Sequence, residues 1–272
     1  MGDNRAIGIF DSGLGGLTVT KEIIKLLPNE NIVYFGDTGR VPYGTRSMEI
    51  IRKYAREDEA LLMEHNVKLI VAACGTVSSV AADTGSELPV PFVEVVSHSV
   101  DAAVKSTKNK KIGVLATAVT IHSGAHRRQI LKALPDAVVV ESSGTLLVPL
   151  VEEGWTDSSD TVVREVLRRY LKPMTDEGVD TLILGCTHFP VLAGVIGEIL
   201  GDGVTLINMG VAAANAVKCK LETADMLNTD GKEGRHCFYV SDKPQSFKKT
   251  AAILLGEEID DKSVEKVCSD GI

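Results

Sequence analysis

Short apolar runs alternate with helical patterns along most of the chain. Strand-like runs occupy residues 6–10, 32–35, 67–73, 90–95, 111–115, 137–141, 181–185 and 237–240. Apolar residues with helical spacing lie between or after these runs, at residues 17–27, 47–65, 77–82, 123–133, 161–175, 190–200 and 247–255. Alternating strands and helices predict parallel sheets that are covered by helices.

The pattern repeats weakly within the chain, because residues 5–13 resemble residues 111–117. We therefore predict an α/β fold with two similar lobes, each a mainly parallel sheet flanked by helices. The active site would lie in the cleft between the lobes. The first lobe would comprise residues 1–97 and 208–272, with the C-terminal strand and helix completing it, and the second lobe residues 98–207.

Each half of the chain has an apolar run that stops at a cysteine, Cys74 in the first and Cys186 in the second. A threonine follows each cysteine, as Thr76 and Thr187. Ligands of parallel α/β sheets bind at the carboxyl ends of strands, so facing lobes would bring both thiols to one cleft. One thiolate could then accept a proton while the opposite thiol donates one. The alternative for each thiol alone is an inert, buried cysteine.

Two loops after strands are candidates for binding an anion. Residues 11–16 (Asp-Ser-Gly-Leu-Gly-Gly) open a helix and allow close backbone approach. They match neither the Walker loop nor G-x-G-x-x-G, which argues against a nucleotide. The alternative is a tight turn capped by Asp11 or Ser12. Residues 42–44 (Pro-Tyr-Gly) could present N–H groups to a carboxylate, or form an ordinary turn.

The histidines and remaining cysteines give weaker signals. His188 follows Cys186 by two residues and could exchange a proton with the thiol or the substrate; a Cys-x-His zinc site would lack its completing pair. His122 and His126 are four residues apart but lack the glutamate of H-E-x-x-H, so a solvated helix face is expected and no metal site. Three cysteines have no matching context and are interpreted as structural or incidental: Cys219, Cys237 and Cys268.

Composition narrows the function classes. The 272 residues are 44% hydrophobic and 24% charged, as in ordinary globular proteins, and suffice for one large or two small domains. A net charge of −8 argues against nucleic-acid binding. No apolar stretch reaches membrane-spanning length, and residues 1–5 are polar, so neither a span nor a signal peptide is expected. Five cysteines without a C-x-x-C pair favour the reducing cytoplasm.

In their order along the chain, these motifs resemble those of glutamate racemases, in the aspartate/glutamate racemase family. The matching segments are residues 9–19, 34–37, 42–44, 73–74, 148–154, 185–190 and 247–256. The resemblance spans nearly the whole chain, and the ordered set is highly specific. It implies cofactor-independent interconversion of L- and D-glutamate, without PLP or metal, to supply D-glutamate for peptidoglycan. The family also tends to form dimers, so a homodimer is expected.

The resemblance implies roles for individual residues. Cys74 and Cys186 would be the acid/base pair on opposite faces of the substrate Cα, with Asp11 assisting Cys74 and His188 assisting Cys186. The residues that would hold the substrate are Asp11, Ser12, Tyr43, Gly44, Gly75, Thr76, Thr187 and His188. Two residues would act indirectly, Glu153 by influencing the second thiol, and Thr117.

Three departures from the family pattern concern substrate affinity and choice. Gly75 stands where the family usually has asparagine, and a lost hydrogen bond to a charged ligand costs about 1.5–3 kcal/mol. Residues 144–145 (Gly-Thr) replace Cys-Pro, and residues 207–210 replace a more usual acidic segment. Both thiols remain. Two alternatives therefore stay open, a racemase of aspartate or another acidic amino acid, and a non-catalytic binding protein with the same fold.

Overall fold

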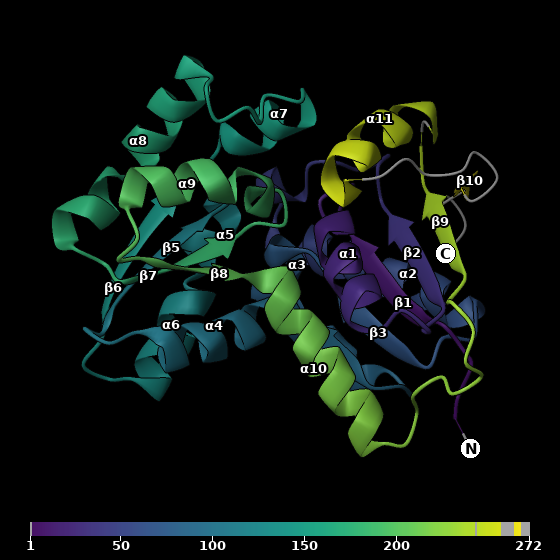
Figure 1. The fold of residues 1–272 in the computed structure, drawn as a ribbon. Helices are drawn as coiled ribbons and strands as arrows, with labels where there is room; N and C mark the ends of the chain where they lie inside the picture. The colour runs from purple at the N-terminus through teal and green to yellow at the C-terminus, as the bar shows by residue number, and fades with distance from the viewer. Residues whose placement is uncertain (1, 243, 257–263, 268–272) are drawn as a thin grey trace.

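The computed structural model describes residues 2–242, 244–256 and 264–267, which form two parallel sheets (Figure 1). The first sheet contains β1 (Ile7–Asp11), β2 (Ile32–Gly36), β3 (Leu69–Ala72), β4 (Phe92–Glu94), β9 (His236–Val240) and β10 (Val264–Lys266), in the order β10-β9-β2-β1-β3-β4. The second contains β5 (Lys111–Ala116), β6 (Val138–Ser143), β7 (Thr181–Gly185) and β8 (Thr205–Asn208), in the order β6-β5-β7-β8. The predicted fold class is confirmed.

Helices cover both sheets. They are α1 (Leu17–Leu26), α2 (Met48–Glu64), α3 (Gly75–Val80), α4 (Val95–Ser106), α5 (Ala118–Ser123), α6 (Ala125–Ala133), α7 (Leu147–Glu152), α8 (Thr161–Glu177), α9 (Ala193–Leu200), α10 (Met209–Thr223) and α11 (Pro244–Leu255). Short 3₁₀ turns occupy Tyr43–Thr45, Ala82–Glu87 and Phe189–Leu192. In the second lobe, α8 and α9 lie on one side of the sheet, and α4 and α6 on the other (Figure 1).

Burial on both faces explains why the strands are continuous apolar runs. All five residues of β1 are buried, as are all four of β3. Parallel strands between two helical layers have this pattern, whereas alternating patterns belong to half-exposed sheets. The longer helices also begin at side-chain caps, since Asp160 accepts hydrogen bonds from the first N–H groups of α8.

One hydrophobic cluster extends through both lobes. Ile9 of β1, Val114 of β5 and Val217 of α10 belong to the same buried cluster. Helix α10 follows the last strand of the second sheet and packs on both α1 and α4, so it joins the lobes (Figure 1). The C-terminal strand β9 returns to pair with β2. The boundaries at residues 97/98 and 207/208 stay a prediction.

The helix predicted over residues 123–133 begins at Ala125, and a separate short helix, α5, precedes it, which changes the environment of a histidine. Between α5 and α6, Gly124 adopts a left-handed φ of 64°, a conformation that ends helices and that glycine takes without strain. His122 and His126 therefore do not share a helix face. His122 is exposed as predicted, but the prediction of a solvated His126 is wrong, because this ring is 1% exposed.

None of the described helices combines the length and the apolarity that crossing a lipid bilayer requires.

Candidate active site

The carboxyl ends of strands from both sheets surround a cavity of about 360 Å³, the interlobe pocket. The first lobe supplies residues 11–14, 41–45 and 74–76, and the second supplies residues 117–118, 144–145, 148–149, 152 and 185–188. Every residue that the sequence suggested for catalysis or substrate binding lies in this lining, together with Thr117. Glu153 does not, and it is exposed.

Cys74 lies at the end of β3, where it precedes the first residue of α3. Its side chain is 5% exposed, and its Sγ atom lies 3.4 Å from Ser12 Oγ. Burial, and next the charge of Asp11, raise the pKa of the Cys74 thiol to about 12. A thiol is therefore the stable form of Cys74 at neutral pH, which makes it a proton donor.

Asp11 is the last residue of β1 and is 2% exposed. Its Oδ1 atom accepts a hydrogen bond of 2.9 Å from the N–H of Gly13, so the tight turn considered as an alternative is present. Burial raises the pKa of Asp11, while the charge of His188 and the N–H groups of Gly16 and Gly13 oppose this rise. The turn and the pocket wall are thus the same structure.

Cys186 follows β7 and is 6% exposed. Its Sγ atom lies 3.8 Å from Nδ1 of His188, and Nε2 of His188 lies 3.1 Å from a carboxylate oxygen of Glu152. Burial alone would lower the pKa of His188, but the contacts with Cys186 and Glu152 outweigh it and raise the pKa to about 10. The imidazole is therefore protonated at neutral pH and places a positive charge beside the Cys186 sulfur.

Glu152 is a site residue that the sequence interpretation missed in favour of its neighbour Glu153. Helix α7 places Val148 and Glu152 four residues apart on one face, and both line the pocket. Leu147 and Val151 are buried on another face of the helix. The four-residue spacing does not separate the two glutamates, because Pro149, four residues before Glu153, also lines the pocket.

Tyr43 lines the pocket, but its hydroxyl does not point to a ligand position. The side chain is 1% exposed, and the hydroxyl donates to Asp37 and lies 3.1 Å from Oδ2 of Asp58. Arg40 completes this buried network, since it lies 2.5 Å from Asp37 and 3.0 Å from Asp58. Tyr43 therefore anchors the loop through its hydroxyl, while Tyr43 and Gly44 both line the pocket.

Threonines of the two lobes meet at the pocket. Thr76 Oγ1 lies 3.2 Å from Thr117 Oγ1, which is also 2.9 Å from Thr120 Oγ1. Thr187 lines the opposite part of the pocket, and its carbonyl accepts a hydrogen bond of 2.7 Å from Thr18 of α1. Hydrogen bonds between the lobes therefore exist beside both cysteines.

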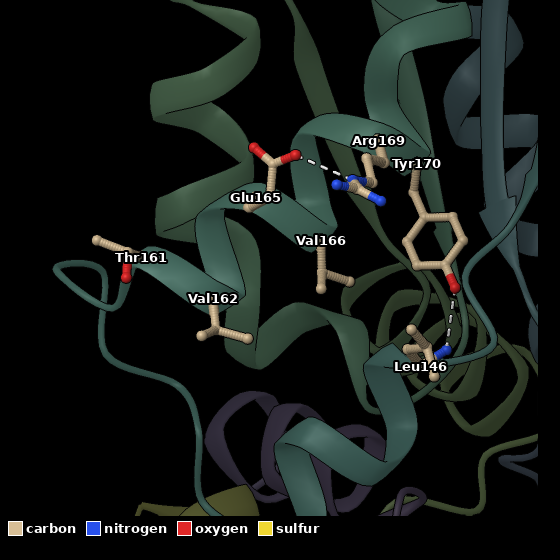
Figure 2. A pocket seen from close by; sticks show the side chains of 7 residues that line it. All are labelled: Leu146, Thr161, Val162, Glu165, Val166, Arg169 and Tyr170. Carbon is tan, nitrogen blue, oxygen red and sulfur yellow. Dashed lines mark hydrogen bonds and ion pairs between the residues drawn. The ribbon is translucent and has the colours of Figure 1, made fainter.

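A second hollow of about 540 Å³ lies on the surface of the second lobe, where Leu146 faces residues of α8 (Figure 2). The hydroxyl of Tyr170 accepts a hydrogen bond of 3.3 Å from the Leu146 N–H, and Arg169 is paired with Glu165 at 2.9 Å (Figure 2). None of the suggested site residues line this hollow. Its charged pair is exposed, so it lacks the buried acid and base of the interlobe pocket.

The cysteines outside the pocket remain without a role. Cys219 and Cys237 are free thiols and are exposed, which agrees with an incidental role, and Cys268 lies outside the described residues. His126 is buried with neither ring nitrogen hydrogen-bonded among the described residues, and burial lowers its pKa to about 4. Among the described residues, no group of three or more His, Cys, Asp or Glu has a metal-binding arrangement.

Comparisons with known proteins agree with this geometry. The Asp/Glu/Hydantoin racemase family matches residues 7–217. Glutamate racemase of Neisseria meningitidis is 42% identical over 265 residues, which cover 96% of each chain. Glutamate racemase of Geobacter metallireducens is 42% identical over 258 residues, or 94% of this chain and 95% of the relative.

Solved structures give the same result. Glutamate racemase from Francisella tularensis in complex with D-glutamate superimposes with a TM-score of 0.91 at 37% identity, covering 99% of this chain and 100% of that one. These similarities extend over nearly the full length and include both sheets. The chain therefore belongs to the Asp/Glu/Hydantoin racemase family, and the prediction that it is an amino-acid racemase is confirmed.

Proposed function

We propose that this protein interconverts L- and D-glutamate by proton transfer at Cα between Cys74 and Cys186, without PLP or a metal. The observation that carries the proposal is that two thiols, one from each lobe, line one pocket, with Asp11 acting on Cys74 and His188 lying beside Cys186. The substrate is inferred from the full-length relatives, which are glutamate racemases, and from the similar structure that was solved with D-glutamate.

In one direction of the reaction, Cys186 acts as the thiolate base beside His188, and Cys74 acts as the thiol acid. The thiolate takes the Cα proton from one face, and the electron pair left at Cα takes the proton of the opposite thiol. Configuration is inverted, and the two sulfur atoms exchange protonation states. The opposite enantiomer, which presents its proton to Cys74, returns the enzyme to the starting state.

The difficult step is removal of a proton beside a carboxylate, because negative charge accumulates on the substrate. Preorganised hydrogen-bond donors in a pocket that excludes water can stabilise this charge. We assign this role to the hydroxyl groups of Ser12, Thr76 and Thr187 and to the backbone N–H of Gly44, because these four residues line the pocket. Thr117 supports Thr76 through their 3.2 Å contact.

Glu152 replaces Glu153 as the carboxylate that we propose acts through His188, because its 3.1 Å contact is with the ring that approaches Cys186. Asp11 is assigned to Cys74, whose thiol form its charge favours. We also propose that the product D-glutamate enters peptidoglycan and that the enzyme acts in the cytoplasm as a homodimer.

Circular dichroism of L-glutamate incubated with the purified protein tests the proposal. The signal should decay to zero as the racemate forms, and Cα should acquire deuterium in D₂O. A parallel incubation with L-aspartate measures substrate choice. An unchanged signal from L-glutamate over hours, without deuterium at Cα, would contradict catalysis; faster turnover of aspartate would contradict the choice of glutamate.

A further inference from the structure

The two backbones that carry the catalytic thiols meet at a pair of glycines. Gly75 directly follows Cys74 and begins α3, and Gly185 directly precedes Cys186 and ends β7. We propose that Gly75 is a positioning residue, whose missing side chain lets the lobes approach until the two thiols lie within proton-transfer distance of the same Cα. This role rests on the proposed function, because it concerns the same two thiols.

The space at Gly75 is closed by backbone of the other lobe. A Cβ atom at this position would lie 2.7 Å from the carbonyl oxygen of Gly185, whereas ordinary contacts are 3.4–4 Å. A flexible side chain could move away from such a clash, but a carbonyl at the end of a buried strand cannot. With the lobes placed as they are in this protein, a side chain at position 75 would therefore push α3 away from β7.

The backbone conformation of Gly75 does not itself require glycine. Gly75 begins a helix and is not among the glycines with positive φ. Alanine would therefore adopt its backbone angles without strain. Glycine is required here because of the contact between the lobes, so a substitution at this position tests how closely the lobes approach.

A second close approach lies on the other side of Cys186. A Cβ atom at Gly15, in the loop after β1, would lie 2.1 Å from Thr187 Oγ1 and 2.6 Å from the His188 ring. The first lobe thus meets the residues before and after Cys186 through two positions without side chains. Together these contacts fix how Cys186 faces the first lobe.

Two departures from the family pattern meet at this point. Met209, within the departing segment 207–210, has its Cε atom 3.5 Å from the position of a Cβ on Gly75. Met209 is 1% exposed, so its side chain occupies space beside Gly75 that a longer residue would need. The asparagine usual in the family would therefore meet both the Gly185 carbonyl and the methionine in this protein.

Gly75→Ala is the direct test. We expect kcat to fall about 10- to 100-fold in both directions, because a displacement near 1 Å can cost about 10²-fold, whereas KM should change less than about threefold. The isotope effect with Cα-deuterated glutamate should rise, since proton transfer over a longer distance becomes rate-limiting. The matched control is Gly194→Ala on α9, where a Cβ has no neighbour within 4 Å, and it should behave as wild type.

The isotope effect separates positioning from loss of folded protein, because a smaller active fraction leaves it unchanged. A reduced kcat with an unchanged isotope effect would therefore overturn the proposal, as would a kcat within twofold of wild type. Gly75→Asn gives a second test. We expect a lower kcat that Met209→Ala partly restores in the double variant, and a kcat/KM above wild type would instead show that a missing hydrogen bond is the main consequence of Gly75.

Failure of the proposed role of Gly75 can be told apart from failure of the proposed function. If the wild-type protein did not racemise glutamate, the proposed function would fail, and crystal structures of wild type and Gly75→Ala would still measure the contact. A separation of residue 75 from the Gly185 carbonyl that is larger in the variant supports the closure role; equal separations overturn it.

Discussion

Cys74 and Cys186 have the same local scaffold but different chemical surroundings. Each follows a buried parallel strand, and each is almost completely buried. Around Cys74, the nearest polar groups are the Ser12 hydroxyl and the Asp11 carboxylate, and burial with the Asp11 charge raises the thiol pKa to about 12. These surroundings favour a thiol.

The ring beside Cys186 carries a charge opposite to that of Asp11. His188 approaches the sulfur, and Glu152 approaches His188 from α7, so the ring pKa rises to about 10. The two strand ends thus place the cysteines in the same way, while the groups around each sulfur carry different charges. A two-base reaction needs both, since one sulfur must lack the proton that the other carries.

Removing either thiol should have the largest effect, and the two variants should differ. Cys74→Ala and Cys186→Ala should each reduce racemisation at least about 10²–10⁴-fold. Cys74→Ala keeps the Cys186–His188 base, so it should still exchange the Cα proton of one enantiomer with D₂O. Cys186→Ala keeps only a thiol with a pKa of about 12 and should exchange neither. Proton NMR of each enantiomer measures this, and equal exchange by both variants would contradict the asymmetry.

Glu152→Gln should have the next largest effect, because it removes one of the contacts that raise the pKa of His188. A fall of one unit in this pKa corresponds to about tenfold in the protonation equilibrium, so we expect kcat above pH 10 to fall by up to about tenfold, with a smaller change at neutral pH. The high-pH limb of the kcat profile should also move to lower pH. Glu153→Gln is the matched control, since this adjacent carboxylate is exposed, and similar profiles for both variants would disprove the assignment of Glu152.

The same groups should make stability depend on pH. His188 has a folded pKa of about 10 against an ordinary value of 6.5, so its stabilisation is complete below 6.5 and is lost as pH rises towards 10. The pKa of Cys74 rises from 9.0 to about 12 on folding, so its stabilisation is lost as the pH rises between these two values. Melting temperatures from pH 6 to 10 should therefore fall less in His188→Asn than in wild type. Cys219→Ala, which removes an exposed thiol, should follow wild type, and parallel curves for His188→Asn would exclude the linkage.

The sequence predicts the repeated part of the site better than the asymmetric part. Apolar runs that end at Cys74 and Cys186 are local signals, and burial of parallel strands on both faces makes them reliable. The choice between Glu152 and Glu153 depended on the orientation of a helix of six residues. The burial of His126 depended on the helix break at Gly124, which the apolar spacing did not indicate.

Contacts between distant segments were the least predictable. Tyr43 was expected to hold the substrate, and its loop does line the pocket. One hydroxyl partner, Asp37, precedes Tyr43 in the same loop, but the other, Asp58, lies on α2. Nothing in the loop sequence indicates the second partner, because it is set by how α2 packs beside the first sheet.

Tyr43→Phe should have the smallest effect on chemistry, and it tests whether the loop of the first lobe only positions substrate. The variant keeps the ring but removes the donor to two buried carboxylates, Asp37 and Asp58. Loss of a hydrogen bond to a charged group should lower the free energy of unfolding by about 1.5–3 kcal/mol. The hydroxyl bonds to Asp37 and Asp58 and to neither sulfur. We therefore expect KM to rise several-fold while kcat stays within about threefold.

Urea unfolding and initial rates in both directions measure these effects, and Tyr54→Phe is the control. The Tyr54 ring packs 5.2 Å from the Tyr43 ring and lies under Arg40, so the control alters the same cluster without removing the Tyr43 hydroxyl. A large loss of kcat in Tyr43→Phe with unchanged KM would mean that this hydroxyl affects proton transfer itself. The division between a first-lobe loop that binds and two cysteines that exchange protons would then be wrong.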